Sequence, residues 1–203
     1  MTGLGVLVSG SGTNLQAILD AEKRGELGAE VRLVVSNLPG VRALERAQAA
    51  GVATRVLAHR DFASREAYDE ALARCLGEAR VELIALAGFM RIVTPRFLQA
   101  FPGRVLNIHP SLLPAFPGLH AQRQALEHGV KVSGCTVHFV DEGCDTGAII
   151  AQAAVPVCEG DDEAALTARI LVEEHRLYPA ALRAVAEGRV RLSGRRVVIQ
   201  SRP

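Results

Sequence analysis

Strand-like and helix-like segments alternate along the first half of the chain, and this alternation limits the folds open to it. Strand-like runs occupy residues 5–9, 31–36, 53–57, 83–87 and 104–109. Between them, apolar residues recur at helical spacing in residues 15–25, 41–50 and 68–79. Strands that alternate with helices predict parallel βαβ units with right-handed crossovers. We therefore expect an α/β fold with a Rossmann-like, mostly parallel sheet and helices on both faces.

The second half of the chain has a different pattern. Residues 132–140 and 148–157 are predicted strands, and a turn-rich loop of residues 141–147 joins them. Asp161 and Asp162 favour the start of a helix, because acidic residues stabilise its positive end. We expect this helix to run to about Leu177 and Pro179 to break or kink it. Residues 190–199 are predicted to form a terminal hairpin.

Composition excludes several classes of protein. A net charge of +1 gives no broad basic surface for nucleic acid. No run of about 18 apolar residues predicts a membrane span, and the first residues are typical of a strand and not of a signal peptide. The four cysteines form no CxxC pair, which indicates reduced thiols. We expect a cytoplasmic protein of 203 residues that folds as a single domain.

A glycine-rich loop joins the first predicted strand to the first helix, with the sequence SGSGTN at residues 9–14. Glycines let the backbone approach an anion, and free N–H groups at the helix start favour a phosphate. A P-loop would need Gly-Lys-Ser/Thr where Thr13 and Asn14 stand. A dinucleotide fold would need a glycine at Leu15 and an acid near Asn37. The pattern favours a simple phosphate monoester, and a tight turn without ligand is the alternative.

Asn107 and His109 carry the chemistry of the predicted strand 104–109. They project from one face because strand side chains alternate, and they lie at the carboxyl end, where parallel sheets bind ligands. An amide and an imidazole suit acyl transfer, because both can stabilise a developing oxyanion. Asp145 could orient His109 and favour its protonated form. Since Ser111 has no nucleophile context, we favour direct transfer without a covalent enzyme intermediate.

Simpler interpretations of these residues stay open. A strand-end histidine is often structural, and residues 141–147 could be only a hairpin loop. His109, His138 and Asp145 could form a two-histidine, one-carboxylate metal site. No HxH or HxxxH spacing supports that site, so we expect no metal.

Six segments together form a recognisable pattern: SGSGTN (9–14), LAGFMRI (86–92), NIHPSLLP (107–114), FPGLH (116–120), VHFV (137–140) and DTG (145–147). They resemble the phosphoribosylglycinamide formyltransferases, also called GAR transformylases, of the folate-dependent formyltransferase family. The resemblance covers essentially the whole chain in order, and the long Asn-x-His-Pro motif is highly specific. It implies the formyltransferase fold. We divide the single domain 1–203 into a phosphate-binding Rossmann-like half, 1–100, and a catalytic and folate-binding half, 101–203.

The resemblance also implies a reaction. The formyl group of 10-formyltetrahydrofolate would move to the amine of 5'-phosphoribosylglycinamide through a tetrahedral intermediate. The products would be 5'-phosphoribosyl-N-formylglycinamide and tetrahydrofolate, in de novo purine (IMP) biosynthesis. The implied partners are these two small molecules, with no nucleic acid, membrane or metal, and the chain would be a monomer or homodimer.

Individual roles follow from the same resemblance. Asn107, His109 and Asp145 match the family's catalytic trio, in which Asp145 would also accept the amine proton, with water as a relay. The residues that match its ribonucleotide site are Gly12, Thr13, Asn14 and Glu174. Those that match its folate site are Arg65, Met90, Arg91, Ile92, Val93, Asn107, Asp141 and Asp145. His120 and His138 match histidines that support the trio. Leu171 departs from the pattern, since a polar or basic side chain can approach the phosphate there, and Ser11 replaces an asparagine common in some members.

Folate-dependent enzymes of the same family that catalyse other reactions are the alternative interpretations. Methionyl-tRNA formyltransferase adds an RNA-binding C-terminal domain, for which we expect this chain to be too short. Formyltetrahydrofolate deformylase adds an N-terminal regulatory domain, and here we expect the first strand within ten residues of Met1. A deformylase that activates water with the same trio is the main alternative. A phosphosugar-binding protein without catalysis is the next.

Overall fold

Seven strands form one sheet, in the order β3-β2-β1-β4-β5-β6-β7. In the computed structural model, which describes residues 1–201, the elements are β1 (Thr2–Val8), α1 (Thr13–Lys23), β2 (Ala29–Ser36), α2 (Arg42–Ala49), β3 (Thr54–Val56), the short 3₁₀ helix η1 (His59–Asp61), α3 (Arg65–Glu78), β4 (Leu83–Leu86), α4 (Pro95–Ala100), β5 (Val105–His109), α5 (Ala121–Glu127), β6 (Val132–Phe139), β7 (Ile149–Pro156), α6 (Glu163–Ala186), β8 (Val190–Ser193) and β9 (Arg196–Ile199). The first five strands pair in parallel, whereas β6 and β7 are antiparallel. The predicted mostly parallel α/β sheet is confirmed.

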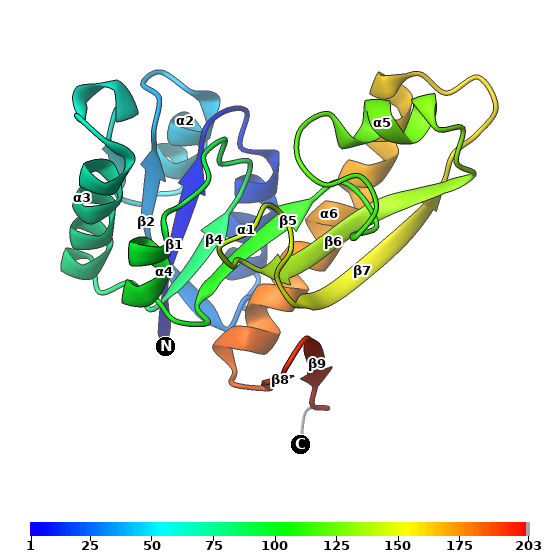
Figure 1. Cartoon of the computed structure of the whole chain (residues 1–203). Coiled ribbons are helices and arrows are strands. Elements are labelled where there is room, and N and C mark those ends of the chain that lie inside the picture. The colour runs from blue at the N-terminus through cyan, green and yellow to red at the C-terminus, as the bar shows by residue number, and fades with distance from the viewer. Residues whose placement is uncertain (202–203) are drawn as a thin grey trace.

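Helices cover both faces of the parallel part of the sheet. Strand alternation separates the buried side chains of β1, so that Leu4, Val6 and Val8 join one core cluster and Leu7 the other. The first cluster also contains residues of α1, α2 and α6, and the second contains residues of α3 and α4. Figure 1 shows β6 and β7 extending away from the parallel strands, with α5 near their far end. A third cluster packs α5 and α6 against these two strands.

The predicted end of helix α6 near Leu177 is wrong, and Pro179 does not break it. Helix α6 begins after the N-cap Asp162, as expected, but it continues through Pro179 to Ala186. Proline removes one intrahelical hydrogen bond, yet here its ring is buried, and Tyr178, Ala181 and Leu182 pack into the core on either side of it. Tertiary packing of the apolar face therefore outweighs the local cost.

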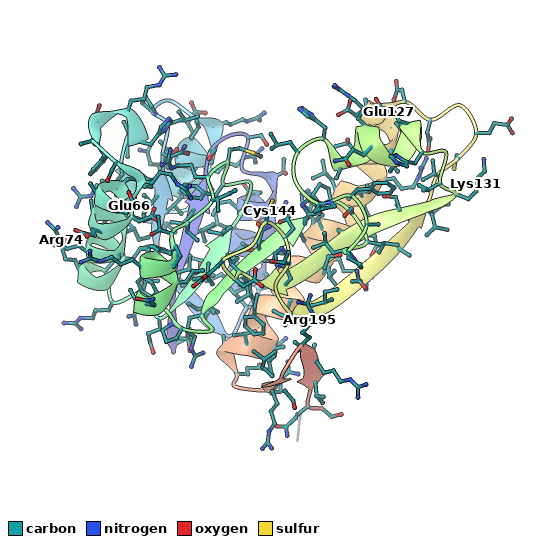
Figure 2. All side chains as sticks on the ribbon, in the orientation of Figure 1. Glu66, Arg74, Glu127, Lys131, Cys144 and Arg195 are labelled. Atoms are coloured by element: carbon teal, nitrogen blue, oxygen red, sulfur yellow. The ribbon has the colours of Figure 1, made fainter. Side chains whose placement is uncertain are left out.

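The predicted terminal hairpin is present as β8 and β9. Val190 and Val197 pack against the larger core cluster. Arg195, in the turn of the hairpin, donates a 2.9 Å hydrogen bond from Nη2 to the carbonyl of Thr146. Figure 2 shows this arginine where the hairpin meets the ends of β6 and β7. Within residues 1–201, no helix is long and apolar enough to cross a membrane.

Candidate active site

The phosphate loop is shaped by one glycine that cannot be replaced. Gly12 is the N-cap of α1 and has a left-handed backbone with φ 71°. A Cβ at this position would lie 2.7 Å from the Cα of Ala43 in α2. Both the positive φ and the close helix contact therefore require glycine here. The loop ends β1 and starts α1, so its free N–H groups point to the carboxyl edge of the sheet.

Asn14 and Glu174 link this loop to α6. Asn14 Nδ2 donates a 2.7 Å hydrogen bond to Glu174 Oε2, and both side chains are buried. Burial raises the pKa of Glu174, and the Asn14 hydrogen bond opposes that rise. Among residues 1–201, Asn14 Oδ1 is buried and has no hydrogen-bond partner. An unpaired buried acceptor costs free energy unless a donor reaches it, and a ligand hydroxyl or amine would be such a donor.

Asn107 and His109 lie on one face of β5, while Leu106 and Ile108 pack into the core on the other face. This alternation confirms the strand argument. Asn107 Nδ2 lies 3.4 Å from Asp145 Oδ1, and His109 Nδ1 lies 3.3 Å from Asp145 Oδ2. The three predicted catalytic side chains therefore form one cluster, although Asp145 lies far away in sequence.

Asp145 is held as a buried carboxylate. Its side chain is 12% exposed. Burial raises its pKa, but hydrogen bonds from His138 and the Gly118 N–H, with the charges of His109 and His138, outweigh burial and lower the pKa to about 2. The Gly118 N–H donates to Oδ2 at 2.8 Å. Asp145 is therefore ionised at neutral pH.

Both ring nitrogens of His109 face acceptors. Nε2 lies 2.8 Å from the carbonyl oxygen of Phe116, and Nδ1 faces the carboxylate of Asp145. A carbonyl oxygen only accepts hydrogen bonds, and an ionised carboxylate does the same. Each ring nitrogen therefore has a protein acceptor to which it can donate a hydrogen bond when it carries a proton.

His138 supports the same carboxylate from the neighbouring strand. It pairs with Asn107 in the antiparallel β5–β6 register. Its Nδ1 lies 2.8 Å from the carbonyl of Phe139, and its Nε2 lies 3.5 Å from Asp145 Oδ1. The structure thus places His138 next to Asp145, and its supporting role stays a prediction. His120 lies elsewhere, exposed at the start of α5, and within residues 1–201 it makes no hydrogen bond to the trio.

The predicted folate segment follows β4, next to the strand that carries Asn107. Met90 and Ile92 are 69% and 55% exposed, whereas Val93 is 3% exposed. Val93 can therefore offer a ligand only its backbone. Arg65 Nη2 donates a 2.8 Å hydrogen bond to the Ile92 carbonyl, so the structure brings Arg65 to this segment. Arg91 stacks its guanidinium over the ring of Tyr68, 4.6 Å from the centroid.

The loop of residues 141–147 is ordered by Asp141. Its Oδ1 accepts hydrogen bonds from the Thr146 hydroxyl at 2.6 Å and the Gly143 N–H at 3.2 Å. Asp145 itself has a left-handed backbone with φ 55°. Its neighbours Gly143 and Thr146 are held by the hydrogen bonds to Asp141. Gly147 cannot carry a side chain, because a Cβ would collide with the Phe139 carbonyl.

Ser9 and Asn37 join the phosphate loop to the folate segment, a role that the sequence did not predict. Ser9 Oγ donates a 2.6 Å hydrogen bond to Asn37 Oδ1 and accepts one of 2.9 Å from the Met90 N–H. The only signal in the sequence was their position, since Ser9 ends one predicted strand and Asn37 directly follows the next. Ser111 is fully buried and donates to the Ala115 carbonyl, which agrees with its exclusion as a nucleophile.

The metal-site alternative concerned His109, His138 and Asp145. In residues 1–201, no group of three or more His, Cys, Asp or Glu side chains is arranged to hold a metal ion. His109 also has both ring nitrogens turned toward protein acceptors, the Phe116 carbonyl and the Asp145 carboxylate.

Comparison with known proteins identifies the family. A model described as formyl transferase matches residues 4–182. The chain belongs to the formyl transferase family. Phosphoribosylglycinamide formyltransferase of Escherichia coli strain K12 is 49% identical over 187 residues, which cover 92% of this chain and 88% of that protein. The resemblance seen in the sequence motifs is therefore confirmed.

Two more similarities place this formyl transferase within its family. The trifunctional purine biosynthetic protein adenosine-3 of Drosophila melanogaster is 57% identical over 190 residues, which cover 93% of this chain but 14% of that protein. The chain thus spans a small part of that relative. A crystal structure of glycinamide ribonucleotide transformylase 1 from Symbiobacterium toebii has 58% identity and a TM-score of 0.98, and the match covers 99% of this chain and 95% of that one. The expected formyltransferase fold is confirmed, and none of these relatives is named as a hydrolase.

Proposed function

We propose that this formyl transferase moves the formyl group of 10-formyltetrahydrofolate onto the amine of 5'-phosphoribosylglycinamide, a step of de novo purine synthesis. The buried cluster of Asn107, His109 and Asp145, beside the phosphate loop on the same edge of the sheet, is the observation that carries the proposal. The names of the Escherichia coli and Symbiobacterium toebii relatives support the same reaction.

Each member of the trio has a role in this proposal. Asn107 donates a hydrogen bond from its amide to the negative charge that develops on the formyl oxygen. Protonated His109 stabilises that charge from the same face of β5. Asp145 holds His109 protonated and oriented through its 3.3 Å contact. Asp145 also accepts the amine proton, with water as a relay. As the tetrahedral intermediate collapses, the bond between the formyl carbon and the folate nitrogen breaks, and that nitrogen takes up a proton from solvent.

The ribonucleotide site combines the phosphate loop with Glu174. The backbone N–H groups of Gly12, Thr13 and Asn14 would bind the phosphate at the start of α1. Glu174 and the unpaired Asn14 Oδ1 would accept hydrogen bonds from the sugar or amine. The substrate then spans from α1 to the end of β5, where the trio lies.

The segment after β4 fits a reduced folate. It combines exposed apolar side chains, Met90 and Ile92, with a buried polar atom, Arg91 Nε, that has no partner within residues 1–201. Apolar walls with a few unpaired polar groups are typical of sites for flat heterocycles. Val93 would contribute through its backbone, Asp141 through the loop that it orders, and Arg65 would lie toward the glutamate tail. When bound, the folate supplies the activated formyl group.

We also propose that residues 1–203 act as one domain. The sheet continues across the boundary at residue 100, because β4 and β5 pair directly. Folate residues 90–93 belong to the first half and Glu174 to the second, so each half contributes to both substrate sites.

The test of the proposed function is conversion of 10-formyltetrahydrofolate, followed by absorbance with and without 5'-phosphoribosylglycinamide. We expect folate conversion that depends on the ribonucleotide and yields its formylated product. Free formate without the acceptor would indicate a deformylase, and no conversion under either condition would indicate a binding protein; both results would overturn the proposal.

A further inference from the structure

Helix α2 contacts the phosphate loop through a single helical turn. The Ala43 N–H donates a 3.1 Å hydrogen bond to the Gly10 carbonyl, and the backbone of Ala43 lies against Gly12. Three residues later, Arg46 Nε donates a 2.9 Å hydrogen bond to the Ser11 carbonyl. Residues three apart share a helix face, so one turn of α2 holds three consecutive loop residues.

Arg46 supplies a charge that the loop lacks. The segment SGSGTN contains no lysine or arginine, and Leu171, where a basic side chain would suit a phosphate, is apolar. Within residues 1–201, Arg46 forms no ion pair, and its second hydrogen bond goes to the neutral Gln16 Oε1 at 3.0 Å. Its positive charge is therefore not neutralised by a carboxylate.

The surroundings of Arg46 are open to a ligand. A cavity of about 360 Å³ runs along α1 from Thr13 to Arg24, and Arg46 lines it. The carboxylate of Asp20 also lines it and accepts a 3.0 Å hydrogen bond from Gln16 Nε2. Arg24 also lines this cavity, but it pairs with Glu26 at 2.6 Å. Within residues 1–201, Arg46 is thus an arginine that bonds to the phosphate loop and forms no ion pair.

We propose that Arg46 is a positioning residue for the substrate phosphate, an inference that rests on the function proposed above. A carbonyl oxygen turned toward a phosphate would repel it, and Arg46 holds the Ser11 carbonyl by a charge-assisted hydrogen bond. The N–H groups of the next residues then face the phosphate, and the guanidinium adds a positive charge.

Three variants test this role. Arg46→Ala removes the hydrogen bonds and the charge, and Arg46→Lys keeps only the charge. Arg42→Ala is the matched control, because Arg42 lies on α2, is exposed and makes no hydrogen bond or ion pair within residues 1–201. Calorimetric titration with ribose 5-phosphate measures the dissociation constant of the phosphate site. Steady-state kinetics gives kcat and the KM for each substrate.

We expect Arg46→Ala to weaken ribose 5-phosphate binding about tenfold or more, as for a lost hydrogen bond to a charged group. Arg46→Lys should bind with intermediate affinity, and Arg42→Ala should stay within about twofold of the wild type. KM for the ribonucleotide should rise by a similar factor in Arg46→Ala. The KM for folate and kcat at saturation should change little, and this separation would not follow from a general loss of structure.

Several results would overturn the proposal. These are unchanged ribose 5-phosphate affinity in Arg46→Ala, an Arg46→Lys variant that binds no better than Arg46→Ala, and a wild-type protein that does not bind ribose 5-phosphate. If Arg46→Ala does not fold, Arg46→Gln replaces it with the same expected loss. Failure of the proposed function can be distinguished from failure of this inference. The first would appear as an absence of formyl transfer, whereas the ribose 5-phosphate affinities of the variants would still measure the contribution of Arg46.

Discussion

The chemistry of this site depends on how one carboxylate is surrounded. Asp145 accepts a hydrogen bond from the Gly118 N–H and faces two imidazoles, so its charge is satisfied although it is largely buried. The spacing of Asn107 and His109 could be predicted because strand side chains alternate. Gly118 and the Phe116 carbonyl could not be predicted, because the loop after β5 folds back onto the strand and no local pattern encodes that return.

Substitution of the trio should reduce turnover strongly. Loss of one oxyanion donor typically lowers the rate by a factor on the order of a hundred to a thousand. We expect Asn107→Ala and His109→Ala to lose at least this much in kcat. Asp145→Asn should lose as much or more, because His109 then has no anionic partner. Steady-state kinetics with both substrates saturating would measure these losses.

The control for these variants is Asp61→Asn, an isosteric change of an exposed aspartate in η1. It should retain kcat within about twofold, as most surface substitutions away from special features do. Turnover near that of the wild type in any of the three trio variants would contradict the assignment of that residue.

Asp145 should also make the stability of the protein depend on acid pH. Its pKa is about 2 in the folded protein, below the ordinary value of 3.8, so the folded state binds this proton less readily. The stabilisation is fully present above about pH 4 and is lost as the pH falls through the folded pKa. A shift of this size corresponds to about 2 kcal/mol. Urea unfolding of the wild type and Asp145→Asn should therefore show a difference that shrinks between pH 5 and pH 2; a constant difference would contradict the ionised state.

At the scale of elements, the strands and the long helices were predictable, whereas two short helices were not. The helix of residues 68–79 and the strands of the sheet carry several turns or repeats of one pattern. Helices α4 and α5 have six and seven residues, too few for a periodic signal. The start of α4 did carry a local signal, since Thr94 caps it and Pro95 is its first residue. The helix end expected before Pro179 was wrong because the local sequence does not show how this segment packs against the core.

The terminal hairpin has a predicted effect on the catalytic loop. Arg195 holds the carbonyl of Thr146, directly after Asp145. We expect Arg195→Ala to raise KM for the folate or lower kcat by about two- to fivefold, since one exposed hydrogen bond contributes about 1 kcal/mol or less. The control is Arg191→Ala in the same hairpin, because the Arg191 side chain makes no hydrogen bond or ion pair within residues 1–201. Equal kinetics for the two variants would show that the hairpin does not act on the loop.

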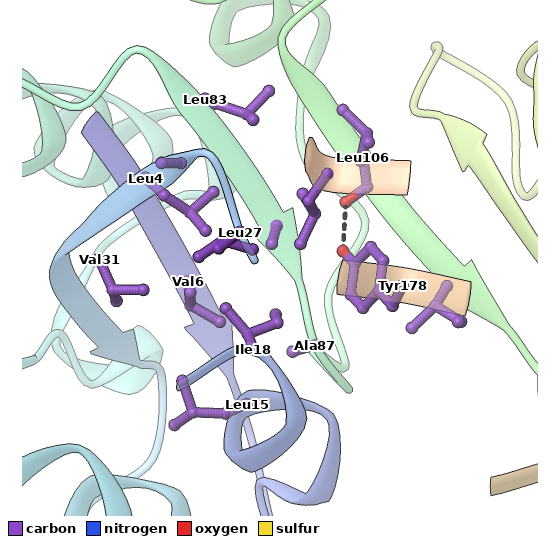
Figure 3. Close-up of a cluster of buried hydrophobic side chains, with 14 of the residues drawn as sticks. Leu4, Val6, Leu15, Ile18, Leu27, Val31, Leu83, Ala87, Leu106 and Tyr178 are labelled. Atoms are coloured by element: carbon purple, nitrogen blue, oxygen red, sulfur yellow. Dashed lines mark hydrogen bonds between the residues drawn. The ribbon is translucent and has the colours of Figure 1, made fainter. Parts of the chain in front are cut away.

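At the scale of the whole molecule, α6 connects the two halves of the site. Glu174 reaches the phosphate loop after β1, and Tyr178, one turn later, reaches the centre of the sheet. The Tyr178 hydroxyl lies 3.0 Å from the carbonyl oxygens of both Leu86 in β4 and Leu106 in β5, and Figure 3 shows its bond to Leu106. These strands end at the folate segment and at the catalytic trio. One helix therefore fixes the phosphate loop, the folate segment and the trio relative to one another.

Two buried tyrosines allow this connection to be measured. Tyr178 and Tyr68 are both fully buried, but the Tyr68 hydroxyl has no hydrogen-bond partner within residues 1–201. Burial raises the pKa of Tyr178 well above its usual value, so its hydroxyl stays protonated and donates. Tyr178→Phe should lower the free energy of unfolding by about 1–2 kcal/mol, because it removes a buried hydrogen bond.

Tyr68→Phe should be neutral or stabilising, because it removes a hydroxyl that is buried without a partner and keeps the ring on which Arg91 stacks. Urea unfolding of the two variants, with the same m-value as the wild type, would measure the difference. Equal destabilisation by both substitutions would mean that the Tyr178 hydroxyl stabilises the fold by filling space and not by its hydrogen bonds. The sheet and α6 would then be held together by apolar packing alone, and the spacing between the phosphate loop and the trio would not depend on this hydrogen bond.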